Sequence, residues 1–265
     1  MHKIIYSSDL HGNRLLYERL IKKASEEDIN GLVIGGDLCP RGGATIRDTI
    51  KIQKKFLEEF MLPLFYNFDK DIFLIMGNDD FRVNSMILEN NNNIKYINKK
   101  SLKINNNVNI AGYSFVNPTP FRLKDWEKPD FEGDKYTAQL FLDEIVSVKK
   151  ENGAIKEDLW QLGKLSDPKK TVYVIHAPPF NTKLDIIADG AHVGSKAVME
   201  FIENEQPPLT LHGHIHESPK MSGSWKDKIG KTICVNVGSS YPEDKLNCVV
   251  IDVDDLSDMK YLELR

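Results

Sequence analysis

The sequence predicts an α/β fold in which two mixed β-sheets face each other and helices cover their outer faces, a four-layer αββα sandwich. Three observations lead to this prediction. Short apolar segments recur along the chain, amphipathic helical patterns separate the first of them, and the last ones follow each other without a long helical pattern. The 265 residues suffice for one large hydrophobic core, so we expect residues 1–265 to form a single domain.

Eight short apolar segments are predicted to be strands. Several are apolar at every position, as expected for strands that are buried between two layers. The predicted strands are 3–8, 31–36, 71–76, 108–115, 171–175, 209–211, 232–237 and 247–253.

Two helical patterns, 14–25 and 46–60, separate the first three strands. Leu and Ile recur in both at steps of three and four residues, which is the period of an amphipathic helix. Asn13 stands directly before the first pattern and is suited to be its N-cap. These β-α-β units predict a parallel first sheet with helices outside it.

The last three predicted strands have a different organisation. Segments 209–211, 232–237 and 247–253 follow one another through turn-rich links in which no helical pattern is evident. We therefore expect them to form a second, partly antiparallel sheet.

Residues 117–134 contain three prolines and several aromatics but no clean period. Connections of this length without secondary structure are usually functional. We therefore predict a lid or substrate loop that covers the active site. Phe121 or Trp126 could contact substrate, for example by stacking on a nucleobase. The alternative is that these aromatics only pack the loop onto the body of the protein.

The composition is that of an ordinary globular protein. Hydrophobic residues make up 41% and charged residues 28%, and 35 Lys and Arg stand against 39 Asp and Glu, a net charge of −4. A membrane-spanning protein is not expected, and nucleic acid is an unfavourable partner because phosphate affinity requires concentrated Lys and Arg. The initial apolar run is too short for a signal peptide, and three widely spaced cysteines suggest neither disulfides nor a zinc cluster, which predicts a cytoplasmic protein. The oligomeric state is not predicted.

Polar residues follow several of the predicted strands, at the point where each strand ends. In an open α/β sheet this edge is where ligand crevices form, so we expect these side chains to meet in one region. Taken singly, each is more often a helix cap or a turn residue than a metal ligand. The residues are Asp9, His11, Asp37, Asn78 and His176, and a further segment adds His212, His214 and His216.

In this order the residues resemble the motifs of the calcineurin-like metallophosphoesterases. The segment at 9–11 resembles D-x-H, 36–42 resembles G-D-x3-R-G, 77–80 resembles G-N-H-[ED], and 213–216 resembles G-H-x-H. His176 is similar to the family's single histidine after a strand. Each motif alone is weak, whereas all of them in order and anchored to strands are specific.

The resemblance implies a dinuclear metal centre in a phosphoesterase that hydrolyses P–O bonds by attack of a metal-bridging hydroxide. One metal would be held by Asp9, His11, Asp37 and His216. The second would be held by Asp37, Asn78, His176 and His214, so that Asp37 bridges the two. Imidazole, carboxylate and amide ligands without thiolates suit Mn, Fe or Zn, of which we favour Mn.

The sequence departs from the family at Asp79, which stands where the family has the histidine that protonates the leaving oxygen. A carboxyl group beside two cations should have a lowered pKa and be a poor donor. His192 or His212 could replace it, although a structural role is an alternative for both. Asp80 is expected to cap a helix near residue 81. Arg41 matches the motif arginine and could either contact phosphate or form an ion pair within the site.

The resulting prediction is a metal-dependent phosphodiesterase acting on a small phosphoester. Two alternatives remain, a non-catalytic metal-binding scaffold with the same fold and a nuclease of the same superfamily. The candidate catalytic residues are Asp37, Asn78, Asp79 and His192.

Overall fold

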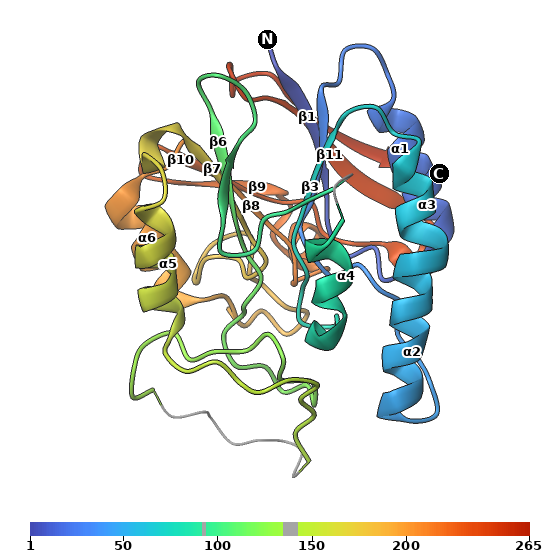
Figure 1. The fold of residues 1–265 in the computed structure, drawn as a ribbon. Coiled ribbons are helices and arrows are strands. Elements are labelled where there is room, and N and C mark those ends of the chain that lie inside the picture. Colours follow the sequence, from blue (N-terminus) through green and yellow to red (C-terminus); the bar gives the residue numbers. More distant parts are fainter. Residues whose placement is uncertain (92–93, 135–142) are drawn as a thin grey trace.

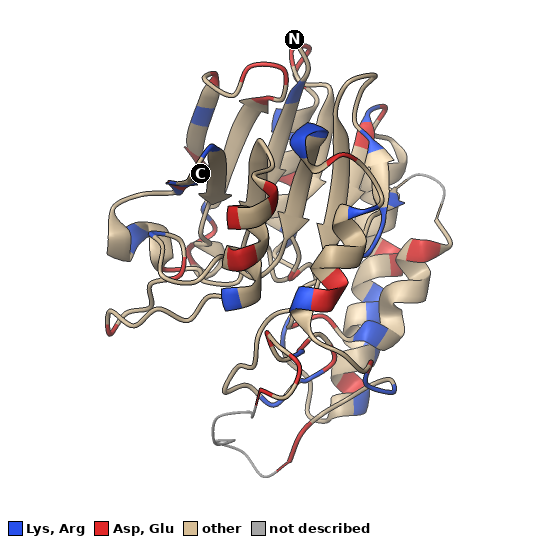
Figure 2. Ribbon diagram, turned by 90° about the vertical axis from the view of Figure 1, so that its left-hand side faces the viewer, with Lys and Arg blue, Asp and Glu red and all other residues tan. Residues whose placement is uncertain are grey.

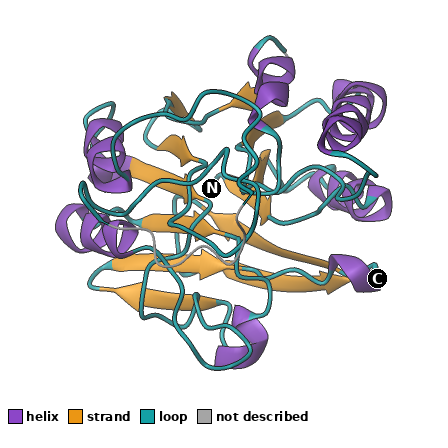
Figure 3. Ribbon diagram, turned by 90° about the horizontal axis from the view of Figure 1, so that it is seen from below, coloured by secondary structure: helices purple, strands orange, loops and turns teal. Residues whose placement is uncertain are grey.

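Two six-stranded sheets face each other in the computed structural model, which describes residues 1–91, 94–134 and 143–265. Helices lie on the outer side of each sheet (Figures 1 and 3). This arrangement is the predicted αββα sandwich. None of the helices in the described part of the chain is long and apolar enough to cross a membrane.

The first sheet has the strand order β12-β11-β1-β2-β3-β4. Strands β1 to β4 are parallel, as the β-α-β pattern predicts, and β11 pairs antiparallel with β1. The strands are β1 (Lys3–Ser7), β2 (Gly31–Ile34), β3 (Asp71–Leu74), β4 (Lys95–Tyr96), β11 (Leu246–Asp252) and β12 (Met259–Leu264).

The second sheet has the order β5-β6-β7-β8-β10-β9. Its four central strands are parallel, and its two edge strands pair antiparallel. The strands are β5 (Ser101–Lys103), β6 (Asn109–Tyr113), β7 (Thr171–Ile175), β8 (Leu209–His212), β9 (Lys226–Ile229) and β10 (Thr232–Asn236).

The predicted grouping of the last three strands was wrong in one respect. β11 joins the first sheet, whereas β8 and β10 pair parallel in the second. β11 is almost entirely buried, and a strand that is buried on both faces suits either sheet. The local pattern therefore could not select its sheet.

Helices α1 to α4 accompany the first sheet, and α5 and α6 accompany the second (Figure 1). Asn13 caps α1, accepting a hydrogen bond from the Leu16 amide, as predicted. The predicted helix 46–60 corresponds to α2 and the start of a π-helical turn, Leu57–Met61, which continues directly into α3. The helices are α1 (Arg14–Ala24), α2 (Ile46–Phe56), α3 (Leu62–Tyr66), α4 (Ser85–Glu89), α5 (Ile155–Gly163), α6 (Lys196–Glu205) and α7 (Ser218–Ser222), with 3-10 turns at Arg82–Asn84, Pro168–Lys170 and Tyr241–Glu243.

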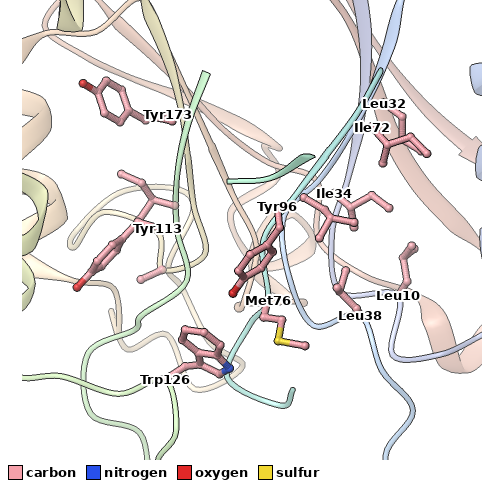
Figure 4. Packing of buried hydrophobic residues seen from close by; sticks show 14 of the residues in the cluster. Leu10, Leu32, Ile34, Leu38, Ile72, Met76, Tyr96, Tyr113, Trp126 and Tyr173 are labelled. Atoms are coloured by element: carbon pink, nitrogen blue, oxygen red, sulfur yellow. The ribbon is translucent and has the colours of Figure 1, made fainter. Parts of the chain in front are cut away.

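Alternate residues of the central strands belong to different parts of the core. Ile4 and Tyr6 of β1 pack with Val172 and Val174 of β7 in a cluster that fills the space between the sheets. Ile5 points the other way and belongs to the cluster that includes the helices. Figure 4 shows part of this second cluster. The period of two thus buries both faces of the central strands.

Candidate metal centre

The candidate ligands come from the ends of five parallel strands. Asp9 and His11 follow β1, and Asp37 and Asn78 follow β2 and β3 of the first sheet. The second sheet contributes from β7 and β8, with His176 after β7 and His214 and His216 after β8. Because the parallel strands of both sheets end on the same side, side chains far apart in the sequence meet there.

Four of these residues form one compact group. Asp9, His11, Asp37 and His216 each offer a donor atom, and these atoms all lie within 4.8 Å of one another. His11 Nε2 lies 3.1 Å from His216 Nε2 and 3.7 Å from Asp37 Oδ2. His216 Nε2 lies 3.4 Å from Asp9 Oδ1. This group is the set that the resemblance assigns to the first metal.

The residues assigned to the second metal lie beside this group. His176 Nε2 lies 3.2 Å from Asn78 Oδ1 and 3.5 Å from Asp37 Oδ1. The rings of His176 and His214 are 5.4 Å apart. Asp37 therefore has one carboxylate oxygen toward His11 and the other toward His176, as a ligand shared by two ions would require.

The chemistry of the donors fits divalent cations such as Mn, Fe or Zn, because the group combines carboxylate, imidazole and amide donors. Burial lowers the pKa of His11 to about 4 and that of His214 to about 3, which favours the neutral imidazole that binds metals. Burial opposes ionisation of Asp9, but His216 and His176 hold the pKa of Asp9 at about 2. These three groups are thus in ligating form at neutral pH.

The backbone is unusual at the same positions. Asp9, His11, Asp37 and His214 all have positive φ, at 57°, 45°, 50° and 68°. Such conformations are uncommon for residues other than glycine and gather at functional sites. Backbone hydrogen bonds hold them, because the Asp9 amide donates to the Gly36 carbonyl at 3.0 Å and the His11 amide to that of Asp37 at 2.9 Å.

Two glycines allow the loops to approach the ligands closely. A Cβ atom at Gly36 would lie 2.6 Å from His176 Nδ1, and Gly36 has a φ of +107°. A Cβ at Gly213 would collide with Asp9 Oδ2 and Ser8 Oγ. A side chain at either position would displace a candidate ligand.

Asp80 does not cap a helix, which corrects the sequence prediction. Its buried carboxylate accepts hydrogen bonds from the amides of Gly77, Leu38 and Cys39 at 2.9, 3.0 and 2.8 Å. The 3-10 turn that follows begins at Arg82 with Phe81 before it, and no side chain caps it. Asp80 instead joins the loop that carries Asp37 to the loop that carries Asn78.

Asp79 lies at the edge of the group and is engaged with Arg41. Arg41 Nε donates to Asp79 Oδ2 at 2.6 Å, and Asp79 Oδ2 lies 3.6 Å from His11 Nδ1. Burial and the negative charge of Asp37 raise the pKa of Asp79 to about 6, although the positive charge of Arg41 opposes this shift. Arg41 also donates to the hydroxyl of Tyr241 at 3.1 Å. The ion pair expected as one role of Arg41 is therefore present.

A cavity of about 760 Å³ opens next to the candidate ligands. Its lining includes Asp37, Asn78, Arg41, Phe121 and His192. Residues 114–134, to which Phe121 belongs, run to the lower end of the molecule in Figure 1. Phe121 is about half exposed, and its position beside the cavity is compatible with the predicted substrate loop.

Trp126 does not line this cavity, which corrects its interpretation as a stacking residue. Trp126 is part of the buried cluster in Figure 4, and only 1% of it is exposed. Its indole packs edge-on against Phe115 with ring centroids 5.2 Å apart. Trp126 Nε1 donates to the Asp80 carbonyl at 2.9 Å. Trp126 anchors the loop to the core.

His212 is structural. It is fully buried, Nδ1 lies 2.9 Å from the carbonyls of Ile175 and Ala177, and Nε2 lies 2.8 Å from Thr210 Oγ1. Both ring nitrogens are therefore occupied by groups of β7, of β8 and of the segment that follows β7.

Sequence reasoning missed two residues that contact the site. Tyr241 places its ring 4.4 Å from that of His11, and Asp185 bonds His192. Asp185 stands seven residues before His192, and this proximity of an acid and a histidine was a usable signal. Nothing in the local sequence distinguished Tyr241.

Comparison with known proteins gives one family match and several relatives. The family model for calcineurin-like phosphoesterases matches residues 2–218. An uncharacterized protein of Methanocaldococcus jannaschii is 28% identical over 258 residues, covering 94% of this chain and 95% of that protein.

Solved structures share the fold at low identity. The protein TT1561 of Thermus thermophilus has a TM-score of 0.62 at 13% identity, covering all of this chain and 99% of its own. GAP50, the anchor in the inner membrane complex of Plasmodium, has a TM-score of 0.51 at 10% identity, covering all of this chain and 89% of its own. With the family model matched over most of its length, the chain belongs to the calcineurin-like phosphoesterases.

Proposed function

We propose that the protein is a phosphodiesterase that uses two divalent cations, with Mn favoured over Fe and Zn. The observation that carries this proposal is the position of Asp37, whose two carboxylate oxygens face different donor sets. Asp9, His11 and His216 would complete one set, and three further ligands from the neighbouring loops would complete the other. Those three are Asn78, His176 and His214.

The bound cations would supply Lewis acidity toward the phosphoryl oxygens and would lower the pKa of water. The chain's own residues would position the substrate. Arg41 places a half-exposed guanidinium on the cavity lining, where it could contact a phosphate oxygen. Residues 117–134 would act as the substrate loop, with Phe121 rather than Trp126 against the substrate. We treat residues 1–265 as one domain in this proposal.

Unless another residue supplies the proton, a diester or a substrate with a good leaving group suits this site better than an alkyl monoester. Asp79 replaces the family's proton-donating histidine and is paired with Arg41, so it is poorly placed to protonate a leaving oxygen. The size of the cavity also leaves room for a second ester group.

Two other functions are less well supported. A fold relative is an anchor by name, but a scaffold has no need of seven inward-facing ligands. For a nuclease, a basic surface is expected. In Figure 2, Lys and Arg are interspersed with Asp and Glu instead. The three cysteines are free and buried, in keeping with the cytoplasmic location inferred from the sequence.

The test combines metal content with turnover. Purified protein should bind close to two equivalents of Mn and hydrolyse an activated aryl phosphodiester only with metal present. Asp37→Asn weakens the shared ligand and should nearly abolish both Mn binding and hydrolysis of the diester, while the circular dichroism spectrum stays unchanged. Near-full turnover by Asp37→Asn with metal present would disprove the two-metal assignment, and metal binding without turnover of any phosphoester would favour the scaffold.

A further inference from the structure

We propose that His192, held by Asp185, donates the proton to the leaving oxygen in this reaction. The inference rests on the proposed function and names the acid that Asp79 does not provide. His192 would be a catalytic residue, and Asp185 a positioning residue that acts through it.

Asp185 fixes the imidazole firmly. His192 Nδ1 lies 2.7 Å from Asp185 Oδ1. The Asp185 side chain is fully buried, and its two oxygens also accept hydrogen bonds from the amides of Thr182, Asn181 and Gly194 at 2.9 to 3.0 Å. Since these bonds anchor the carboxylate to the backbone, they also fix the ring that it holds.

The other side of the imidazole is available. Nε2 of His192 makes no hydrogen bond to any residue in the described ranges, and 31% of the side chain is exposed. His192 lines the cavity that also includes Asp37, Asn78 and His214. One ring nitrogen is thus held by a carboxylate, while the other is free on a residue that lines the same cavity as three candidate ligands, as a general acid requires.

Within residues 1–91, 94–134 and 143–265, no other histidine offers this combination. Four of the seven are candidate ligands, and both ring nitrogens of His212 are engaged. His2 lies directly before β1, at the opposite end of that strand from the candidate ligands, which follow the strand ends. Of the seven, His192 is the one that meets both conditions.

The surroundings of His192 indicate the leaving group that it would serve. Phe121, Phe180 and Val193 line the same cavity, and the Phe180 ring lies 6.2 Å from that of His192. Asn117 Nδ2 donates to the Val193 carbonyl at 3.0 Å, which ties the loop after β6 to the loop that carries His192. An apolar, planar leaving group fits this wall, so we infer an aryl or similarly flat ester group as the part of the substrate that departs here.

In the step, hydroxide derived from water forms the new P–O bond, and the bond from phosphorus to the leaving oxygen breaks. The electron pair of that bond goes to the leaving oxygen, which takes the proton from Nε2 of the His192 imidazolium. The products are a phosphomonoester and a neutral alcohol or phenol. The proton that water lost returns through solvent to His192, which restores the imidazolium.

The test uses methyl aryl phosphodiesters whose aryl groups range from 4-nitrophenyl to phenyl. For the wild type, log kcat/KM should depend weakly on the acidity of the departing phenol. His192→Gln should lower kcat/KM for the phenyl ester by roughly 10²-fold or more and that for the 4-nitrophenyl ester by less than about tenfold, because the better leaving group departs without a proton. His2→Gln is the matched control and should change neither.

A merely structural role would not produce three further results. The alkaline limb of the pH profile for the phenyl ester should disappear in His192→Gln. Added imidazole should partly restore phenyl ester hydrolysis in His192→Ala. In the metal-free protein, ¹⁵N NMR should show the neutral His192 ring protonated at Nδ1, and Asp185→Asn should change this tautomer.

The outcomes separate the two proposals. If the wild type hydrolyses no phosphodiester with any metal, the proposed function fails. The second case is an active wild type and an inactive Asp37→Asn variant. If His192→Gln then lowers kcat/KM by the same factor for the phenyl and the 4-nitrophenyl ester, only the role of His192 is overturned. An unchanged tautomer in Asp185→Asn would overturn the positioning role of Asp185.

Discussion

The two aromatic residues of the 117–134 loop should respond oppositely to substitution, although the sequence presents them alike. Trp126→Ala removes an indole that is 99% buried and is packed against Phe115. A buried Trp covers about 150–250 Å² of apolar area, and at about 25 cal/mol per Å² this gives about 4–6 kcal/mol as an upper value. Measured truncations of this kind cost about 3–5 kcal/mol. Phe121→Ala truncates a side chain that is 52% exposed, so its effect on stability should stay within about 0.5 kcal/mol.

Thermal unfolding followed by circular dichroism provides the assay. At roughly 2–4 °C per kcal/mol for a domain of this size, Trp126→Ala should lower Tm by roughly 6–20 °C, and Phe121→Ala by less than about 2 °C. Phe121→Ala should instead raise KM for an aryl diester more than for a small alkyl analogue, since Phe121 lines the cavity. Similar Tm values for the two variants, or a KM effect confined to Trp126→Ala, would refute the assignment of Trp126 to the core and Phe121 to the cavity.

Two further substitutions test the site. Gly213→Ala should weaken the affinity for Mn about 10–100-fold in a metal titration, because the new Cβ would displace Asp9. Gly163→Ala, a substitution within α5, is the control and should leave the Mn affinity unchanged. If the two variants bound Mn equally well, the loop would accommodate the methyl group at residue 213. Arg41→Gln should raise KM for a diester about tenfold or more if the guanidinium binds phosphate, and an unchanged KM with a lowered Tm would restrict Arg41 to its ion pair with Asp79.

Much of the fold and of the ligand group could be predicted because the signals are local. A period of two with apolar residues on both faces identifies a central strand, and a polar residue after such a strand marks the sheet edge. The group of Asp9, His11, Asp37 and His216 assembles from four such positions. The strand ends could be inferred from the neighbours of each residue alone. The ligand group also needed the resemblance of several motifs, taken in their order along the chain, to the calcineurin-like family.

The errors arose where long-range pairing decides the outcome. Asp80 looks like a helix cap from its neighbours, but its carboxylate accepts hydrogen bonds from Leu38 and Cys39, some 40 residues earlier in the chain. Trp126 lies in an irregular, proline-rich segment, where no period indicates which aromatic turns inward. The sheet of β11 depends on its pairing with β1, at the other end of the chain.

The backbone at the ligands bears on the choice between enzyme and scaffold. Four candidate ligands hold positive φ, a conformation that costs a non-glycine residue about 1–3 kcal/mol. Glycine would remove this cost at each position, and the chain uses glycine beside them, at Gly36 and Gly213. Asp or His at such positions gains nothing for folding, since the side chains also bury charge and compete for the same small volume. The strain is explained if these side chains must converge on a cation. Binding of the cation would offset both the repulsion between the carboxylates and the free-energy cost of the positive φ angles. A protein that served only as a scaffold would be more stable with this group relaxed, so the retained strain itself favours a working metal centre.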